Sequence, residues 1–559
     1  MAWSLSAGLK RLASLPLTGA TWVLHRRLTG RRAVLHVPVD GGGDVRAVAL
    51  WLDLLRGVAA DSLVATVVLE IAGTPGGWST CEDLRGVIAD LRRAGKRVVA
   101  WIDAPGNASL WIASAADEVV VPPLAELELT GLGVETSYLR SALDRLGLEA
   151  DVEAAGAYKS FGEPFRRTHP SPEAREALVA LLGEVQDTVE RDLAASRGVP
   201  RAQVRDWLER APLGPDEGLR EGLVDAVAYL DVLLEAEVEA AGQGARRVGW
   251  RGWAFRERLQ RRWEGWGRGR VVAVLHLQGA IVSGDEGGGP RVRAARVVPL
   301  IEALREQPAV EAVVLHVDSP GGSAVASDRI WRAVGRLAEA KPVVACFGDV
   351  AASGGYYLAS PAAEIVARPA SITGSIGVFG GKLVARGAAR KLGVRPVPVA
   401  LAPQALRLSA LRPFDAAQRR SLRASLQRIY DGFVERAALG RGVEVDEIEP
   451  WCRGRVWTGR AACARGLVDR EGDLWDAVAS AERRAELDAG TCRVIHLTPP
   501  EPGGLGRLVR DAARRGLPGA TWRALGLTAE LEGWVEPLVD APGTAVAGLL
   551  QPELLRRPR

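Results

Sequence analysis

Lysine is scarce in this chain of 559 residues, because only six of its 72 basic residues are lysines and the rest are arginines. A composition that prefers arginine makes each retained lysine informative, since drift alone would favour its loss. Lys159 stands between a tyrosine and a serine in the stretch GAYKSFGEPF, and its retention there needs an explanation. The six are Lys10, Lys96, Lys159, Lys341, Lys382 and Lys391.

The chain also lacks a strong excess of one charge and has few cysteines, and both features limit the classes of function. Basic and acidic residues number 72 and 68, so no strong field favours nucleic acid as a partner. The five cysteines are odd in number and scattered, without a CxxC or Cys/His spacing, which argues against a metal site and predicts buried free thiols. They are Cys81, Cys346, Cys452, Cys463 and Cys492.

The N-terminal apolar run, Leu12–Leu24, is too short to cross a bilayer. It has about 13 residues, whereas a spanning helix needs roughly 20. The run contains Pro16 and Gly19 and has no small-residue cleavage site, so it is also a poor signal peptide. Residues 1–30 are therefore predicted to be an N-terminal arm, with anchoring at a membrane interface left open.

The sequence contains two copies of one unit. The segment VVLEIAGTPGG at 67–77 returns as VVLHVDSPGG at 313–322, and GKRVVAWID from Gly95 returns as AKPVVACFG from Ala340. Further pairs follow in the same order: LWIASAADEVVV with YYLASPAAEIVA, LTGLGV with ITGSIGV, and RLGLEADVEAAG with KLGVRPVPVALA. An offset of roughly 245 residues throughout indicates internal duplication.

Each copy alternates short apolar β runs with helical patterns. This alternation predicts an α/β fold built from repeated ββα or βα units. The predicted domains are 31–242 and 271–497, with a linker at 243–270 and a tail at 498–559.

The linker is rich in arginine and tryptophan. Residues 246–270 hold nine arginines, two glutamates and four tryptophans. Such a stretch could lie on an anionic membrane surface. The alternative is a solvated linker helix whose tryptophans pack on the domains, and the sequence favours that alternative without excluding the first.

The second copy carries a candidate nucleophile, Ser353, in DVAASGGYYLASPA. It follows an apolar strand, precedes a helical pattern and has only alanine and glycine beside it, so a substrate carbonyl could approach it. A plain serine N-cap with glycines for packing explains the same residues equally well. The DSPGG turn adds Gly321 and Gly322, whose N–H groups could point at a developing oxyanion.

A base for Ser353 is harder to find among the histidines. The chain has six, and His276 and His316 stand inside apolar strand patterns where a structural role is favoured. Lysine can replace histidine if burial lowers its pKa by several units from about 10.4. By the repeat offset Lys159 aligns with Ala405, and Ser353 aligns near Asn107. Each copy thus retains half of a site. Lys96 and Lys341 are mutual counterparts and are expected to be structural.

With these residues the sequence resembles the signal peptide peptidase A (protease IV) family in its long tandem form, over roughly residues 31–497. The resemblance rests on GAYKSFGEPF, AASGGYYLASPA, SPGGS, TGSIGVFG and GRVWTGRAACARGLVD. It implies a ClpP/crotonase-like fold in both halves and a Ser/Lys dyad without metal or cofactor. Ser353 would be the nucleophile, Lys159 the general base, and Ser375 the residue that orients the lysine. Backbone N–H groups of three glycines would hold the oxyanion, namely Gly321, Gly322 and Gly354.

The resemblance also implies substrates, assembly and location. The expected substrates are apolar peptides, such as signal peptides left in the membrane after processing. The expected assembly is a homotetramer, and the expected location is at the bacterial cytoplasmic membrane. Two rival functions remain: an acyl-CoA enzyme of the crotonase class, which shares the fold and the oxyanion logic, and a non-catalytic scaffold.

Overall fold

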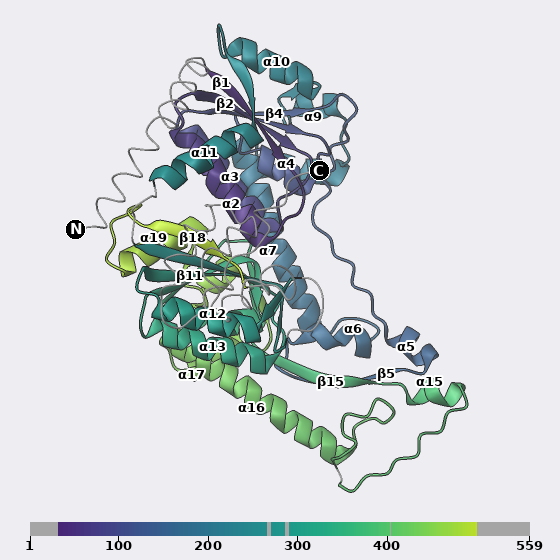
Figure 1. The fold of residues 1–559 in the computed structure, drawn as a ribbon. Coiled ribbons are helices and arrows are strands. Elements are labelled where there is room, and N and C mark those ends of the chain that lie inside the picture. The colour runs from purple at the N-terminus through teal and green to yellow at the C-terminus, as the bar shows by residue number, and fades with distance from the viewer. Residues whose placement is uncertain (1–31, 265–269, 285–289, 403, 500–559) are drawn as a thin grey trace, which may run out of the picture. The chain divides into compact units, whose positions relative to one another are not determined.

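The computed structural model describes residues 32–264, 270–284, 290–402 and 404–499 (Figure 1). All of the predicted N-terminal arm and nearly all of the predicted C-terminal tail therefore lie outside the described residues. In the described ranges, no helix combines the length and the apolar character that crossing a membrane requires. The chain forms two compact units: unit 1 holds described residues 32–133 and 182–264, and unit 2 holds 134–181 and 270–499.

Unit 1 is built on a six-stranded, wholly parallel sheet with the order β6-β4-β3-β2-β1-β7. Its strands are β1 (Ala33–Val39), β2 (Val64–Ile71), β3 (Arg97–Ile102), β4 (Glu118–Val121), β6 (Ala226–Val227) and β7 (Arg246–Gly249). Helices cover both faces, so the strands carry continuous apolar runs. The helices are α2 (Val45–Gly57), α3 (Trp78–Arg93), α4 (Asn107–Ala113), α7 (Pro172–Arg197, which starts in unit 2), α8 (Arg201–Arg210), α9 (Pro215–Glu221), α10 (Leu230–Ala240) and α11 (Trp250–Glu264).

Unit 2 repeats this plan with a larger sheet, ordered β16-β14-β12-β11-β8-β18, to which β13 and β17 add beside β12. All of its pairs are parallel except β14 with β16. The strands are β8 (Val271–Gln278), β11 (Val310–Ser319), β12 (Val343–Ala352), β13 (Glu364–Ala367), β14 (Ile372–Gly374), β16 (Val456–Thr458), β17 (Arg470–Glu471) and β18 (Arg493–Leu497), with a separate pair β9 (Ala280–Val282) and β10 (Arg291–Arg293).

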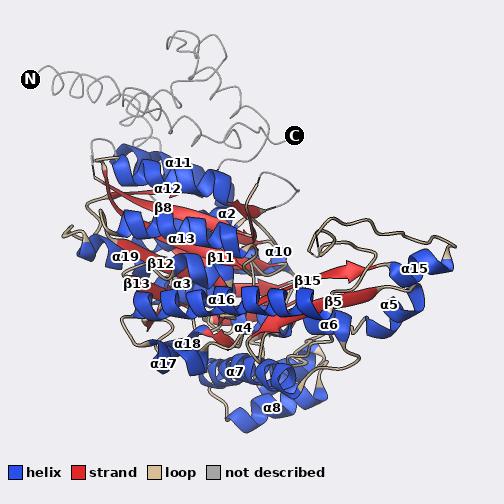
Figure 2. Ribbon diagram, turned by 90° about the horizontal axis from the view of Figure 1, so that it is seen from below, coloured by secondary structure: helices blue, strands red, loops and turns tan. Residues whose placement is uncertain are grey.

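The helices of unit 2 pack on this sheet, as Figure 2 shows by its blue and red elements. The core on one face joins side chains of α12, α13, α14 and α16 to the strands, while α19 contacts β8, β11 and β12. The helices are α5 (Arg140–Leu146), α6 (Glu163–Arg166), α12 (Ala294–Glu306), α13 (Ala324–Ala338), α14 (Gly354–Ala359), α15 (Arg386–Lys391), α16 (Ala416–Arg441), α17 (Val445–Ile448), α18 (Gly459–Cys463) and α19 (Leu474–Arg484).

The two units have matching parts, as the duplication predicts. The order strand, helix, strand, short helix recurs as β2, α3, β3, α4 and as β11, α13, β12, α14. The two counterpart lysines do the same work: Lys96 Nζ donates to backbone carbonyls of Asp61 and Val64, and Lys341 Nζ donates to those of Leu304 and Gln307. The prediction that Lys96 and Lys341 have a structural role is confirmed.

The compact units differ from the continuous domains 31–242 and 271–497 in one exchange. Residues 134–181, which belong to the first copy in sequence, belong to unit 2 in space. The reason is a strand pair: β5 (Glu149–Ala155) pairs antiparallel with β15 (Val378–Val384) over seven residue pairs, from Glu149↔Val384 to Ala155↔Val378. Sequence order could not show this pairing, because the two strands come from different copies.

Within the predicted linker 243–270, the described residues 243–264 belong to unit 1. Strand β7 pairs with β1, and α11 packs on the core through Trp253, which is buried. Trp253 Nε1 donates to Asp61 Oδ2 at 2.9 Å, and its ring stacks on Trp250 at 5.4 Å. These two tryptophans are therefore packing residues, as the favoured alternative expected, and they are not free to lie on a membrane.

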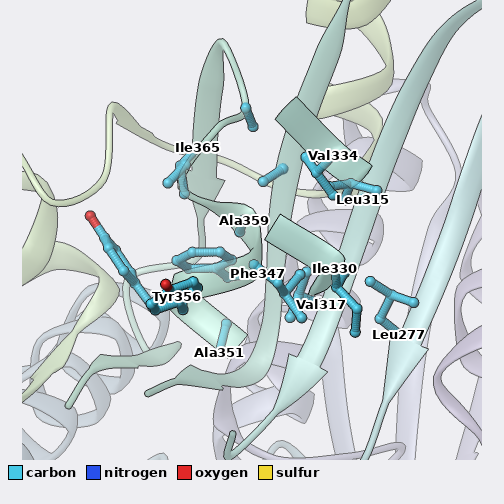
Figure 3. Close-up of a cluster of buried hydrophobic side chains, with 14 of the residues drawn as sticks. Leu277, Leu315, Val317, Ile330, Val334, Phe347, Ala351, Tyr356, Ala359 and Ile365 are labelled. Atoms are coloured by element: carbon cyan, nitrogen blue, oxygen red, sulfur yellow. The ribbon is translucent and has the colours of Figure 1, made fainter. Parts of the chain in front are cut away.

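A dense apolar cluster supports the turn that follows β12. Figure 3 shows Phe347 and Ala351 of β12 with Tyr356 and Ala359 of α14 in one buried layer. Tyr356 also donates its hydroxyl to the Leu467 carbonyl at 2.8 Å. Close packing on both sides fixes the strand and the helix, and thereby fixes Ser353 between them.

Candidate active site

Ser353 occupies a strained turn between β12 and α14. Its φ of 53° and ψ of −120° lie in a region that L residues rarely adopt. The surroundings hold this conformation, since Ser353 N donates to the Gly374 carbonyl at 2.8 Å and the Ser353 carbonyl accepts from Tyr357 N at 2.9 Å. A strained turn between a strand and a helix is also where α/β-hydrolases place their nucleophile.

The glycines around Ser353 allow several backbones to approach closely. A Cβ on Gly321 would lie 2.7 Å from Gly354 N and 2.8 Å from Ser353 Cβ, and a Cβ on Gly355 would lie 2.7 Å from the Ser319 carbonyl oxygen. Glycine is therefore required for packing at these positions. The same close contacts bring the 319–322 turn, which carries two of the predicted oxyanion N–H groups, beside Ser353. The glycines therefore fit both a packing role and a functional role.

Lys159 reaches the same place from the segment that crosses into unit 2. It follows β5 and the Gly156 turn, and its Nζ lies 3.0 Å from Ser353 Oγ. The same nitrogen lies 2.8 Å from the Ser375 carbonyl oxygen and 2.9 Å from Ser375 Oγ. The two halves of the site expected from the duplication thus meet, together with the third predicted residue.

Burial makes the Lys159 amine easier to deprotonate. Desolvation lowers the pKa of Lys159 from its ordinary value of 10.5 to about 8. A neutral amine has two N–H donors and one lone pair, which matches the three neighbouring oxygens. When both N–H groups donate to the carbonyl and hydroxyl of Ser375, the lone pair faces the Ser353 hydroxyl. This arrangement can take a proton from Ser353.

Ser375 is itself held in an unusual conformation. Its φ is 52°, and its N–H donates to the Arg455 carbonyl at 2.6 Å. The residue follows the short strand β14, which pairs with β12, the strand that ends immediately before Ser353. Strain at Ser353 and at Ser375 is consistent with a functional centre.

The three glycines predicted to hold an oxyanion differ in their surroundings. Gly321 N donates to Ser319 Oγ at 3.1 Å, so its N–H is already engaged. Gly354 is the first residue of α14, where a backbone N–H has no acceptor within its own helix. Gly322 lies beside Ile281, in a bridge between the two backbones. Gly354 and Gly322 are therefore stronger candidates than Gly321, and all three roles stay predictions.

The histidines in the strands of unit 2 bond to one another. His276 Nδ1 lies 2.9 Å from His316 Nδ1, and His276 Nε2 lies 2.9 Å from His496 Nδ1. Burial lowers the pKa of His316 to about 4, so its ring is neutral near pH 7. These rings form a ladder across β11, β8 and β18, which accords with the structural role favoured from the sequence.

Unit 1 has a different group where unit 2 has its serine. Asn107 opens α4 and closes its side-chain amide on Gly131, with Nδ2 2.8 Å from the Gly131 carbonyl oxygen and Oδ1 3.0 Å from Gly131 N. An amide held at both ends is no nucleophile. In the described part of the chain, no group of His, Cys, Asp and Glu side chains could hold a metal ion.

Sequence reasoning missed the residues that hold the lysine in place. These lie in the segment 453–457 and beside it, and only the match of GRVWTG to the family drew attention to the region. Glycine in CRGRV was a usable signal, because Gly454 has a φ of +80° and a Cβ there would lie 2.6 Å from Lys159 N.

Comparison with known proteins shows which family the sequence belongs to. The model of peptidase family S49 matches twice, at residues 90–243 and 336–488, so each copy carries one match. ClpP1 of Listeria monocytogenes, in a mutant form, is 14% identical and covers 38% of this chain and 95% of its own, with a TM-score of 0.25. The fold assignment accordingly rests on the two family matches and the sheets described above.

Two curated relatives cover most of the chain. A serine protease SPPA, chloroplastic, from Arabidopsis thaliana is 31% identical over 77% of this chain and 64% of its own length. A protease 4 from Salmonella typhi is 31% identical over 78% of this chain and 72% of its own. The chain thus spans slightly less than two thirds of the Arabidopsis protein. These findings support a serine protease and do not favour the crotonase-class alternative. One family match in each copy, with relatives of this coverage, shows that the chain belongs to peptidase family S49.

Proposed function

We propose that the protein is a serine endopeptidase in which Ser353 is the nucleophile and Lys159 the general base. The observation that carries this proposal is the 3.0 Å distance between Lys159 Nζ and Ser353 Oγ, combined with the lowered pKa of the buried amine. A base with a pKa near the working pH is an efficient proton acceptor. Ser375, with two oxygens on the same amine, orients it.

The reaction proceeds in two halves. Ser353 Oγ attacks the peptide carbonyl carbon while its proton passes to Lys159 Nζ, and the carbonyl oxygen becomes an oxyanion. Backbone N–H groups of Gly354 and Gly322 stabilise this oxyanion. The intermediate collapses as the lysine gives its proton to the departing amine, which leaves an acyl ester on Ser353. Water then attacks the ester, the lysine takes and returns a proton in the same way, and the carboxylic acid leaves.

Apolar peptides, including signal peptides after their release, are the proposed substrates. Besides the family resemblance, two exposed aromatic rings close in sequence to Lys159 and Ser375 support this choice. Phe161 follows Lys159 by two positions, Phe379 follows Ser375 by four, and their exposed rings lie 4.9 Å apart. Such a pair offers an apolar side chain of a peptide a place to pack. Phe161→Asn with Phe379→Asn should raise KM for apolar peptides and leave that for charged peptides nearly unchanged. Equal effects on both would refute the preference.

Assembly into a homotetramer is proposed from the resemblance, and the duplication suggests how copies would join. Within unit 2, β5 of the first copy pairs with β15 of the second. The match of RLGLEADVEAAG with KLGVRPVPVALA makes 395–401 the counterpart of β5, and the match of LTGLGV with ITGSIGV makes 134–140 the counterpart of β15. If the same pairing operates again, 395–401 of one chain pairs with 134–140 of the next, and repetition closes a ring.

The exposure of this segment supports such a contact. Val397, Val399 and Leu401 alternate along it and are at least 84% exposed, which is unusual for three apolar side chains in one short segment. Val399→Asp should therefore reduce the mass measured by light scattering, while Val179→Asp, at an exposed valine of α7, should leave it unchanged. A wild-type chain that is monomeric at micromolar concentration would contradict the proposal.

Association with the bacterial cytoplasmic membrane is proposed on the family resemblance. Flotation of the full chain with anionic and neutral vesicles tests it. Binding that is lost when residues 1–30 are removed would assign the contact to the N-terminal arm, and a full chain that stays at the bottom of the gradient would refute the association.

The central experiment is hydrolysis of casein by the purified protein, by Ser353→Ala and by Lys159→Ala. Both variants should lose activity, and the wild type should react at Ser353 with a fluorophosphonate. Activity that survives either substitution would refute the proposed dyad. A wild type that is folded yet neither labels nor cleaves would favour the scaffold.

A further inference from the structure

Three chain segments meet at the lysine, and each brings a glycine to the junction. A Cβ on Gly156 would lie 2.6 Å from the Arg453 carbonyl carbon, one on Gly454 would lie 2.6 Å from Lys159 N, and one on Gly377 would lie 2.9 Å from Gly454 Cα. The segment 453–455 therefore lies flat between the lysine loop and the loop that carries Ser375.

Backbone hydrogen bonds tie this middle segment to both loops. Tyr158 N donates to the Arg453 carbonyl at 2.8 Å on one side. Gly454 N donates to the Ile376 carbonyl at 2.7 Å and Ser375 N donates to the Arg455 carbonyl at 2.6 Å on the other. The segment 453–455 thus fixes the lysine loop relative to the Ser375 loop.

The side chain of Arg455 closes the junction from outside. Its guanidinium carbon lies 4.9 Å from the centre of the Tyr158 ring and 4.3 Å from the centre of the Trp457 ring. It pairs with Glu176 at 2.8 Å, and Glu176 also accepts the Tyr158 hydroxyl at 2.7 Å. A planar guanidinium can stack and pair at once, which a lysine ammonium cannot reproduce.

We propose that Arg455 is a positioning residue for Lys159, which holds the lysine loop on the Ser375 loop through Tyr158 and Glu176. This inference rests on the proposed dyad. Arg455 touches neither the reacting oxygen nor the amine in its described contacts, and it acts through the residue that precedes Lys159 in the chain. Without it the loop can lift, so the amine moves away from Ser353 and water reaches it.

Two measurable effects follow from this lifting. A displacement of about 1 Å can lower kcat by about 100-fold, because proton transfer depends on the distance between the two groups. Hydration of the amine also moves its pKa from about 8 back toward 10.5, so the acidic limb of the pH profile moves to higher pH. KM should change by about twofold or less, because substrate contacts are not altered.

The test compares Arg455→Ala with Arg455→Lys and with a matched control, Arg465→Ala. Arg465 stacks on the same Trp457 ring at 4.0 Å, but its other ring contact is with Trp451 and not with Tyr158. Arg455→Ala should lower kcat by about 10- to 100-fold and shift the acidic limb upward. Arg455→Lys should recover part of both, because the charge opposite Glu176 returns. Arg465→Ala should keep the kcat of the wild type and the pH of the acidic limb of its activity profile.

Several outcomes would overturn the proposed positioning role of Arg455. A lower kcat with the limb still near pH 8, or equal losses in the Arg455 and Arg465 variants, would indicate a merely structural arginine. If Arg455→Ala does not fold by circular dichroism, Glu176→Gln and Tyr158→Phe probe the same contacts at a half-exposed carboxylate and a single hydroxyl. Wild-type pH profiles in both would refute the proposal. Activity retained by Ser353→Ala would instead refute the dyad, so the two failures are distinguishable.

Discussion

Lys159 and Ser353 stand 194 positions apart in the chain, and the lysine Nζ lies 3.0 Å from the serine Oγ. They come from different copies of the duplicated sequence, yet both belong to one compact unit. The exchange of residues 134–181 into unit 2 is what brings them together.

The pH dependence of cleavage should report the lysine. In the proposed dyad the neutral amine is the active form, so kcat/KM should rise with pH and level off above an apparent pKa of about 8, well below the ordinary 10.5. Initial rates on a soluble peptide between pH 6 and 10 give this limb. A limb near pH 6.5, as for a histidine base, or one near 10.5 would contradict the assignment.

The buried lysine should also lower stability. Its pKa is lower in the folded than in the unfolded chain, so between about pH 8 and 10.5 the unfolded chain binds the extra proton and stability rises with pH. Below pH 8 both states are protonated and the full cost of about 3 kcal/mol applies. Lys159→Met should therefore raise the free energy of unfolding at pH 7, measured in urea, by up to that amount. The advantage should disappear near pH 10.5, and a variant less stable than the wild type at pH 7 would contradict this.

Ser375→Ala should separate the two contacts that Ser375 makes with the amine. The variant keeps the carbonyl at 2.8 Å and loses the hydroxyl at 2.9 Å. A hydrogen bond to a group that becomes charged contributes about 1.5–3 kcal/mol, so kcat should fall by about 10- to 100-fold with little change in KM. Single-turnover kinetics measure this. A wild-type kcat would show that the hydroxyl does not orient the lysine.

Gly321→Ala should damage the site through its backbone. The added Cβ would lie 2.7 Å from Gly354 N at a φ of +96°, so the turn beside Ser353 must shift. Fluorophosphonate labelling should slow by at least about tenfold, and the melting temperature should fall. Gly335→Ala is the matched control, since nothing lies within 4 Å of its Cβ in α13. It should keep wild-type labelling, with stability equal or raised by about 0.5–1 kcal/mol.

The sequence alone allowed much of the site to be predicted, because the unusual residues were visible without coordinates. Lys159 stood out by the scarcity of lysine, Ser353 by its small neighbours, and Asn107 and Ala405 by the mismatch between the copies. Arg455 could not be found in this way, since it is one arginine among many. Its importance depends on which rings and carboxylate surround it, and those come from three distant segments.

Local and repeated patterns in the sequence determined the α/β fold, the two S49 copies and the choice of candidate site residues. Strand and helix periodicity can be recognised in consecutive residues, and internal similarity can be recognised by comparing one stretch of sequence with another. Tertiary structure decided which copy supplies which part. The pairing of β5 with β15 carries the lysine segment into unit 2, and burial beside Ser375 lowers the pKa of its amine. Both effects depend on contacts between segments far apart in the chain, which only the folded molecule brings into range.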